Sequence, residues 1–170
     1  MPDILIAADA DFVVDEVVAA VSGPDADVRV VRRGSDVRGA AEVQIPDLVV
    51  CDLQIGTMGG MAVTIDLRHE AGAGRLPHVP VLMLLDRQAD VYLARRSGAD
   101  AWMVKPLDAF RVRRAVDAAL AGAGTFEGVD EAEWPALRAA ARGEEPPPPP
   151  EPEPEVDEAG AEEAEAVEAG

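Results

Sequence analysis

The chain has 170 residues, enough for one ordinary domain and an additional segment. Its formal net charge is −18, but residues 144–170 carry eleven acidic residues and no basic one. Residues 1–143 then hold 22 acidic against 15 basic residues, a net charge of −7. The basic residues are scattered and form no stripe, so this composition argues against nucleic-acid binding.

Three features indicate the compartment. The single cysteine, Cys51, cannot form an internal disulfide, and its apolar neighbours predict a buried core residue. The N-terminus begins with a strand-like run and shows no basic-then-apolar leader. No apolar run approaches the roughly 20 residues that cross a bilayer. We therefore expect a soluble, cytoplasmic protein without membrane association.

Apolar runs and helical spacings alternate along the first half of the chain. Residues 3–8 predict a strand, and a helix with valines at helical spacing follows, with Asp11 well placed as its N-cap. Residues 27–31 predict a second strand, and residues 32–42 a weak helix. The run 46–53 is rich in β-branched residues and bounded by proline and glycine, which predicts a central buried strand.

The same alternation continues through the second half. Residues 61–70 predict a helix, and residues 79–85 a strand that two prolines introduce. Residues 90–97 predict a helix that ends at a glycine, and residues 100–104 a fifth strand. Apolar residues over 112–120 lie on one face of a last helix. Five strand–helix units predict an α/β fold with a parallel sheet between helices.

This pattern defines three regions of the chain. Residues 1–122 fit the flavodoxin-like (βα)5 doubly wound sheet with strand order 2-1-3-4-5. Residues 123–143 are expected to be a linker, which allows a short helix around Trp134. Residues 144–170 are an acidic Pro/Glu/Ala-rich stretch that cannot bury an apolar face, and we expect it to be a disordered tail.

Strands 1, 3 and 5 end on the same side of the sheet in this order, and their carboxyl ends bring together Asp9, Asp52 and Lys105. A pair of carboxylates can hold a hard dication, and a lysine adds a second positive charge for an incoming phosphoryl group. One carboxylate can then act as the nucleophile. Each residue alone has a simpler explanation, since Asp9 could be a loop acid and Lys105 a surface lysine. Their joint placement favours a site.

At these residues the chain resembles the receiver domain of two-component response regulators, over roughly residues 2–122. Four stretches carry the resemblance, and the last is the most specific: Ile4–Asp9, Pro46–Leu53, Pro80–Leu84 and Gly98–Pro106. The resemblance implies that Asp52 is the phosphoacceptor and that Lys105 contacts the phosphoryl group. It also implies a magnesium ion held by Asp9, Asp52 and the backbone carbonyl of Gln54. Trp102 matches the aromatic residue that changes rotamer on activation.

Three of the departures from the family pattern lie at or beside the expected pocket. Ala8 replaces the first of two adjacent acids, and Leu85 replaces the serine or threonine whose hydroxyl meets the phosphoryl group. Asp86 stands where a small residue is usual, and a like charge there disfavours an incoming anion. We therefore expect that Asp52 can still accept phosphate, while the switch through Leu85 and Trp102 is weakened.

Three functions compete. The first is a receiver in a phosphorelay, phosphorylated by a histidine kinase or phosphotransfer protein and signalling to an unknown partner protein. The second is a degenerate receiver that binds proteins without phosphorylation. The third is an enzyme on the same fold, but the sequence contains no nucleophile elbow, histidine cluster or dinucleotide fingerprint. His69 and His78 are solitary. We expect a non-enzymatic signalling protein without a DNA-binding module.

Overall fold

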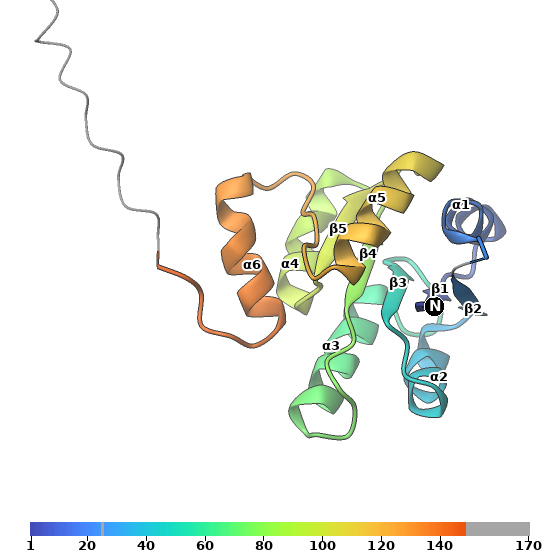
Figure 1. Ribbon diagram of the computed structural model, residues 1–170, viewed down its shortest axis with the longest axis horizontal. Coiled ribbons are helices and arrows are strands. Elements are labelled where there is room, and N and C mark those ends of the chain that lie inside the picture. The colour runs from blue at the N-terminus through green and yellow to red at the C-terminus, as the bar shows by residue number, and fades with distance from the viewer. Residues whose placement is uncertain (25, 149–170) are drawn as a thin grey trace, which may run out of the picture.

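The computed structural model describes residues 1–24 and 26–148. A five-stranded parallel sheet with the order β2-β1-β3-β4-β5 forms its centre, which confirms the predicted fold class (Figure 1). The strands are β1 (Asp3–Ala7), β2 (Asp27–Val31), β3 (Leu48–Asp52), β4 (Val81–Leu85) and β5 (Ala101–Val104).

Six α-helices and three 3₁₀ turns connect and cover these strands within the described residues. The helices are α1 (Asp11–Val21), α2 (Val37–Val43), α3 (Gly60–Gly72), α4 (Val91–Ser97), α5 (Ala109–Leu120) and α6 (Trp134–Ala141). The 3₁₀ turns are η1 (Gly34–Asp36), η2 (Gln88–Asp90) and η3 (Glu131–Glu133). One capping prediction is wrong: α1 begins at Asp11 itself, its N-cap is Ala10, and no side chain caps it. The Asp11 carboxylate instead pairs with Arg32 at 2.8 Å.

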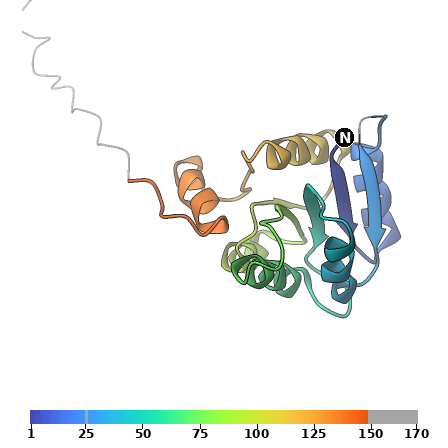
Figure 2. The same cartoon turned by 60° about the horizontal axis from the view of Figure 1, so that its bottom comes forward.

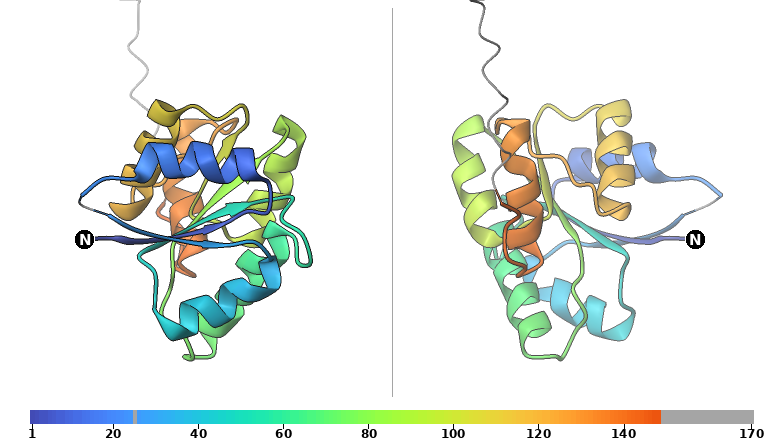
Figure 3. Two further views of the ribbon diagram at one scale, coloured as in Figure 1. Left: turned by 90° about the vertical axis from the view of Figure 1, so that its right-hand side faces the viewer. Right: turned by 60° about the vertical axis from the view of Figure 1, so that its left-hand side comes forward.

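Helices cover both faces of the sheet. α1 and α5 pack on one face, and α2 and α3 lie on the other (Figure 3). Every residue of β1, β3 and β4 is buried, as expected for parallel strands that are covered on both faces. Cys51 is one of them, and burial, with the charge of Asp52 beside it, raises the pKa of its thiol to about 12. Cys51 is therefore a core residue, as its neighbours predicted.

The chain after α5 turns back along β5, at the end of the molecule far from α1 and β2 (Figure 2). We call residues 123–144 the C-terminal segment. Its Phe126 forms an isolated parallel bridge with Trp102 of β5, whose backbone N–H donates to the carbonyl of Thr125 at 3.0 Å. The Phe126 ring is fully buried and lies edge-on to Trp102, with 4.7 Å between ring centroids. The segment thus adds a short extended stretch to the outer edge of β5.

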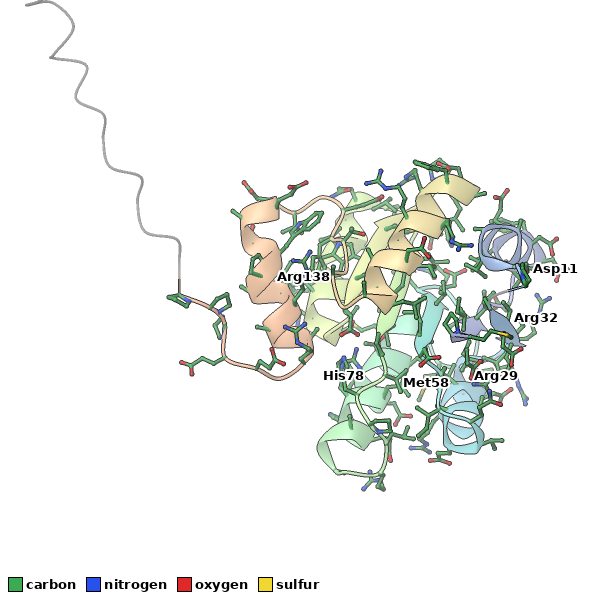
Figure 4. All side chains as sticks on the ribbon, viewed as in Figure 1. Asp11, Arg29, Arg32, Met58, His78 and Arg138 are labelled. Carbon is green, nitrogen blue, oxygen red and sulfur yellow. The ribbon has the colours of Figure 1, made fainter. Side chains whose placement is uncertain are left out.

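Helix α6 lies beside α4, and polar contacts join the C-terminal segment to the rest of the fold. Glu133 accepts from Arg95 of α4 at 2.8 Å. Arg138 extends from α6 toward the turn before Phe126, where it donates to the carbonyl of Gly124 at 3.0 Å (Figure 4). A Cβ at Gly124 would lie 2.1 Å from the carbonyl oxygen of Asp100, so only glycine allows this close approach. The segment expected to be a linker is packed against α4 and β5.

Two further expectations concern the chain ends and the membrane. Residues 144–148 are in neither helix nor strand, and the rest of the expected disordered tail, residues 149–170, lies outside the described residues. Among the residues that the structure describes, no helix is both long enough and apolar enough to span a bilayer.

Candidate functional site

The carboxyl ends of the strands deliver the predicted side chains to one edge of the sheet. Asp52 is the last residue of β3, and Lys105 directly follows β5. Lys105 Nζ lies 2.9 Å from Asp52 Oδ1, although 53 positions separate the two residues in the sequence. The structure therefore brings the predicted phosphoacceptor and the predicted lysine into a direct ion pair.

Asp52 lies in a confined but accessible position. Its side chain is only 3% exposed, and Oδ1 accepts from Lys105 and from the backbone N–H of Gln54 at 3.2 Å. Oδ2 accepts no hydrogen bond from any described residue, yet no buried side-chain oxygen in that part of the chain lacks a partner. Oδ2 therefore retains contact with the solvent side, and this is the oxygen open to a ligand or an electrophile.

Asp9 follows β1 and is tied to the loop after β3. Its Oδ2 accepts the backbone N–H of Gly56 at 3.0 Å. Arg32, at the end of β2, donates to the Asp9 carbonyl at 3.3 Å and to the Asp11 carboxylate, and the two side chains lie together at the edge of the molecule (Figure 4). Asp9 is exposed and has no hydrogen bond to Asp52 or Lys105. It shares their edge of the sheet without joining their ion pair.

Asp86, the unusual acid noted in the sequence, makes a contact that the sequence did not indicate. It follows β4, and its Oδ1 lies 2.9 Å from Lys105 Nζ, so one ammonium group bridges two carboxylates. Burial would lower the pKa of Lys105, but the hydrogen bonds to Asp86 and Asp52 outweigh this effect and the pKa is raised. The expected like charge beside the pocket is therefore paired with the pocket's own lysine.

The oxygen atoms at this edge suit a hard dication. Asp9 and Asp52 contribute carboxylates, and Gln54, in the loop after β3, contributes a backbone carbonyl. Within the described ranges, no group of three or more histidine, cysteine or acidic residues is arranged to hold a metal ion. Ala8, where the resemblance would place another acid, is 1% exposed and packs in the apolar core. Two carboxylates and a carbonyl are a small but chemically appropriate set for Mg²⁺.

The two predicted switch residues lie behind this edge. Leu85, at the end of β4, is fully buried in the apolar cluster that also contains Trp102 and Phe126. It offers no hydroxyl to the pocket. Trp102 is 1% exposed, and its indole N–H donates to the carbonyl of Glu127 at 3.0 Å. The C-terminal segment therefore holds Trp102 in an inward position.

An ion pair that the sequence did not reveal lies next to Lys105. Glu127 of the C-terminal segment pairs with Arg111 of α5 at 2.6 Å, and its other carboxylate oxygen accepts the backbone N–H of Val104 at 2.7 Å. The one signal in the sequence was an aromatic residue, Phe126, between glycines in a stretch otherwise poor in apolar residues. Phe126 anchors the segment, and the anchor places Glu127.

Curated relatives of the chain include response regulators. The chain is 32% identical over 105 residues to the DNA-binding response regulator MtrA of Mycolicibacterium smegmatis, a match of 61% of this chain and 43% of that protein. It is 26% identical over 122 residues to Protein PilH of Pseudomonas aeruginosa, a match of 72% of this chain and 100% of that protein. The chain thus spans less than half of MtrA and all of PilH.

Solved structures share the fold. A putative response regulator from Chloroflexus aurantiacus superposes with a TM-score of 0.65 at 21% identity, over 71% of this chain and 98% of that one. The signal receiver domain of a histidine kinase from Syntrophus aciditrophicus superposes with a TM-score of 0.63 at 22% identity, over 77% of this chain and 96% of that one. The family model described as the response regulator receiver domain matches residues 4–117. With this match over more than half of its length, the chain belongs to the response regulator receiver domain family.

Proposed function

We propose that this protein is a receiver in a phosphorelay and that it accepts a phosphoryl group on Asp52. The observation that carries the proposal is the state of Asp52: one oxygen is paired with Lys105, while the other has no hydrogen-bond donor among the described residues. A nearly buried carboxylate with one open oxygen and an adjacent ammonium group suits nucleophilic attack on phosphorus.

These contacts support the following transfer step. Asp52 Oδ2 attacks the phosphorus of a phosphohistidine, an O–P bond forms, the N–P bond breaks, and the imidazole leaves with a proton from solvent. Lys105 offers its ammonium to the phosphoryl oxygens, where charge is concentrated in the transition state. Asp9 and the Gln54 carbonyl, together with Asp52, would hold Mg²⁺, which neutralises the charge on the phosphoryl group when it is bound.

The partners follow from this chemistry. A phosphohistidine donor means a histidine kinase or a phosphotransfer protein. Beyond residue 117, where the matched region ends, the described residues form the end of α5, η3 and α6, and we propose output through a partner protein. The chain would act as a cytoplasmic signalling module rather than as an enzyme.

Intact-mass measurement after incubation with a small-molecule phosphodonor tests the proposal. The wild type should gain one phosphoryl group in the presence of Mg²⁺ and much less with a chelator. Asp52→Asn should gain none, because its amide is not a nucleophile. Asp47→Asn is a matched control, since Asp47 accepts a backbone N–H of Asp3 at the opposite edge of the sheet. An unmodified wild type at saturating donor and Mg²⁺ would overturn phosphate acceptance.

A second candidate, a degenerate receiver that binds partners without phosphate, is favoured by one contact. Lys105 already pairs with the Asp86 carboxylate, so its ammonium has a resident anion before any phosphoryl group arrives. Partner binding that persists unchanged in Asp52→Asn would support this candidate over the first.

A further inference from the structure

One ion pair holds the backbone on both sides of Lys105. Arg111 donates to the carbonyl of Pro106 at 2.7 Å and to the carbonyl of Val104 at 3.2 Å. Its partner Glu127, 2.6 Å away, accepts the backbone N–H of Val104 at 2.7 Å. The residues before and after Lys105 are thus bonded to two side chains that are bonded to each other.

Glu127 lies ten positions beyond the end of the region that matches the receiver family, which is residue 117. Its backbone is nevertheless well fixed. The Glu127 N–H donates to the carbonyl of Trp102 at 3.4 Å, and its own carbonyl accepts the indole N–H of the same tryptophan at 3.0 Å. The neighbouring Phe126 is fully buried against the Trp102 ring. The carboxylate of Glu127 is therefore delivered to Val104 by a packed, bonded stretch of chain.

We propose that Glu127 is a positioning residue for Lys105, and that the C-terminal segment is thereby an integral part of the phosphoryl-accepting pocket. Charge-assisted hydrogen bonds are the stronger ones, and Glu127 makes two, one to a guanidinium and one to a backbone N–H. Together with Arg111 it fixes the strand end from which the Lys105 side chain reaches Asp52 and Asp86. The consequence for phosphoryl transfer rests on the proposed function, whereas the positioning of Lys105 does not.

The sequence makes the test direct, because Lys105 is the only lysine in the chain. An amine-reactive acylating reagent can modify only Lys105 and the N-terminal amine of Met1, which is 83% exposed and serves as an internal reference. In the wild type the Lys105 side chain is 14% exposed and bonded to two carboxylates, so its acylation should be slow. The rate for each amine is read by peptide mass in the full-length protein under native conditions.

Glu127→Gln should accelerate acylation of Lys105 at least about fivefold relative to Met1, the lower end of a typical coupling between sites. The matched control is Glu133→Gln, which breaks the exposed pair with Arg95, another contact between the segment and the receiver, without touching Val104. It should leave the rate unchanged. Arg111→Gln should reproduce the acceleration, and combining it with Glu127→Gln should add little, because the two side chains act as one unit.

Unfolding midpoints distinguish a specific effect on the position of Lys105 from a general destabilisation of the fold. The inference is supported if Glu127→Gln accelerates acylation while its midpoint stays close to that of Glu133→Gln. It is overturned if both variants accelerate equally, or if Glu127→Gln leaves the rate at the wild-type value.

Phosphorylation of Asp52 by the small-molecule donor is measured on the same proteins. A slower gain of phosphate in Glu127→Gln than in Glu133→Gln supports the link to the pocket. If the wild type gains no phosphate but Glu127→Gln still accelerates the acylation of Lys105, the proposed function fails, whereas the positioning of Lys105 by Glu127 is supported. If the wild type gains phosphate no faster than Glu127→Gln does, and Lys105 is acylated at the same rate in both proteins, the inference about Glu127 is overturned while the proposed function stands.

Discussion

The carboxylate of Asp86 lies as close to the ammonium group of Lys105 as that of Asp52 does, 2.9 Å in each case. A phosphoryl group on Asp52 must therefore share Lys105 with an anion that is already present. The Asp86 side chain is 36% exposed, whereas that of Asp52 is 3% exposed, so solvent screens the Asp86 pair more strongly. The lysine has two partners of unequal strength, and the weaker one competes with the ligand.

Removing this competitor should strengthen binding at the pocket. Asp86→Ala frees one donor of Lys105, and exposed ion pairs are worth up to about 1 kcal/mol, so the affinity for a beryllofluoride mimic should rise by up to about fivefold. Tryptophan fluorescence during a beryllofluoride titration with Mg²⁺ measures it. Asp86→Asn, which keeps the shape without the charge, should show most of the gain. Weaker binding in both variants would mean that Asp86 holds Lys105 in its productive place.

A phosphoryl group has no hydroxyl to meet at Leu85. An unpaired acceptor costs roughly 1 to 3 kcal/mol, comparable to a typical coupling between sites. We expect the wild type to change conformation only weakly, and Leu85→Thr combined with Asp86→Ala to change more. Amide spectra with and without beryllofluoride compare the two proteins. Equal responses that spread across α4 and β5 in both would contradict this expectation.

That comparison needs a control for packing. Leu85 is fully buried, so replacing it with threonine removes apolar contacts and buries a hydroxyl, at a cost of about 2 to 3 kcal/mol. Leu85→Val shortens the side chain to about the volume of threonine without adding a hydrogen-bond donor. A stronger response in the threonine variant than in the valine variant assigns the effect to the hydroxyl.

Cys51 should make the free energy of unfolding fall at alkaline pH. Its pKa is raised from 9.0 to about 12 in the fold, so between these values the unfolded chain loses a proton that the folded chain keeps. The stabilisation is complete below pH 9 and is lost as the pH rises to about 12. Urea unfolding at several alkaline pH values measures the slope. Cys51→Ala should make this pH dependence of the unfolding free energy shallower. The dependence that remains is the contribution of the raised pKa of Lys105. An unchanged slope in Cys51→Ala would exclude Cys51 as the source.

Phe126 should contribute strongly to stability although it lies outside the matched domain. Its side chain is fully buried against Trp102 and 5.9 Å from the Trp134 ring, so Phe126→Ala should lower the free energy of unfolding by about 3 to 5 kcal/mol. Phe110, which is 70% exposed on α5, is the matched control, and Phe110→Ala should change it by less than about 0.5 kcal/mol. Chemical denaturation measures both. Similar small losses would mean that the C-terminal segment is only loosely attached.

The sheet could be predicted because its signals are local. The apolar runs at Ile4 and Val49 are buried on both faces, and their alternation with helices permits few topologies. The strand order then places Asp52 near Lys105 without any knowledge of side-chain geometry. Strand ends in a parallel sheet are positions that a sequence pattern can locate.

The contacts that tune the site could not be predicted in the same way. Asp86 was visible as an unusual charge, but its partner depends on where the Lys105 side chain goes, which no periodicity encodes. Glu127 is harder still, because its contact with Val104 depends on one aromatic anchor and on a close approach at Gly124. Such contacts depend on tertiary packing between distant segments, and the glycine-rich composition of that stretch resembles an ordinary connector.

The bridge between Trp102 and Phe126 also makes the two edges of the sheet unequal. Covering the outer edge of β5 protects it from pairing with another chain, while β2, at the other end of the strand order, has no neighbour among the described residues on its outer side. Val30 of this edge strand is 40% exposed. Backbone-mediated association is thereby directed to one side of the molecule, so contact between copies through strand addition would pair β2 with β2 and close as a symmetric dimer instead of growing into a fibre.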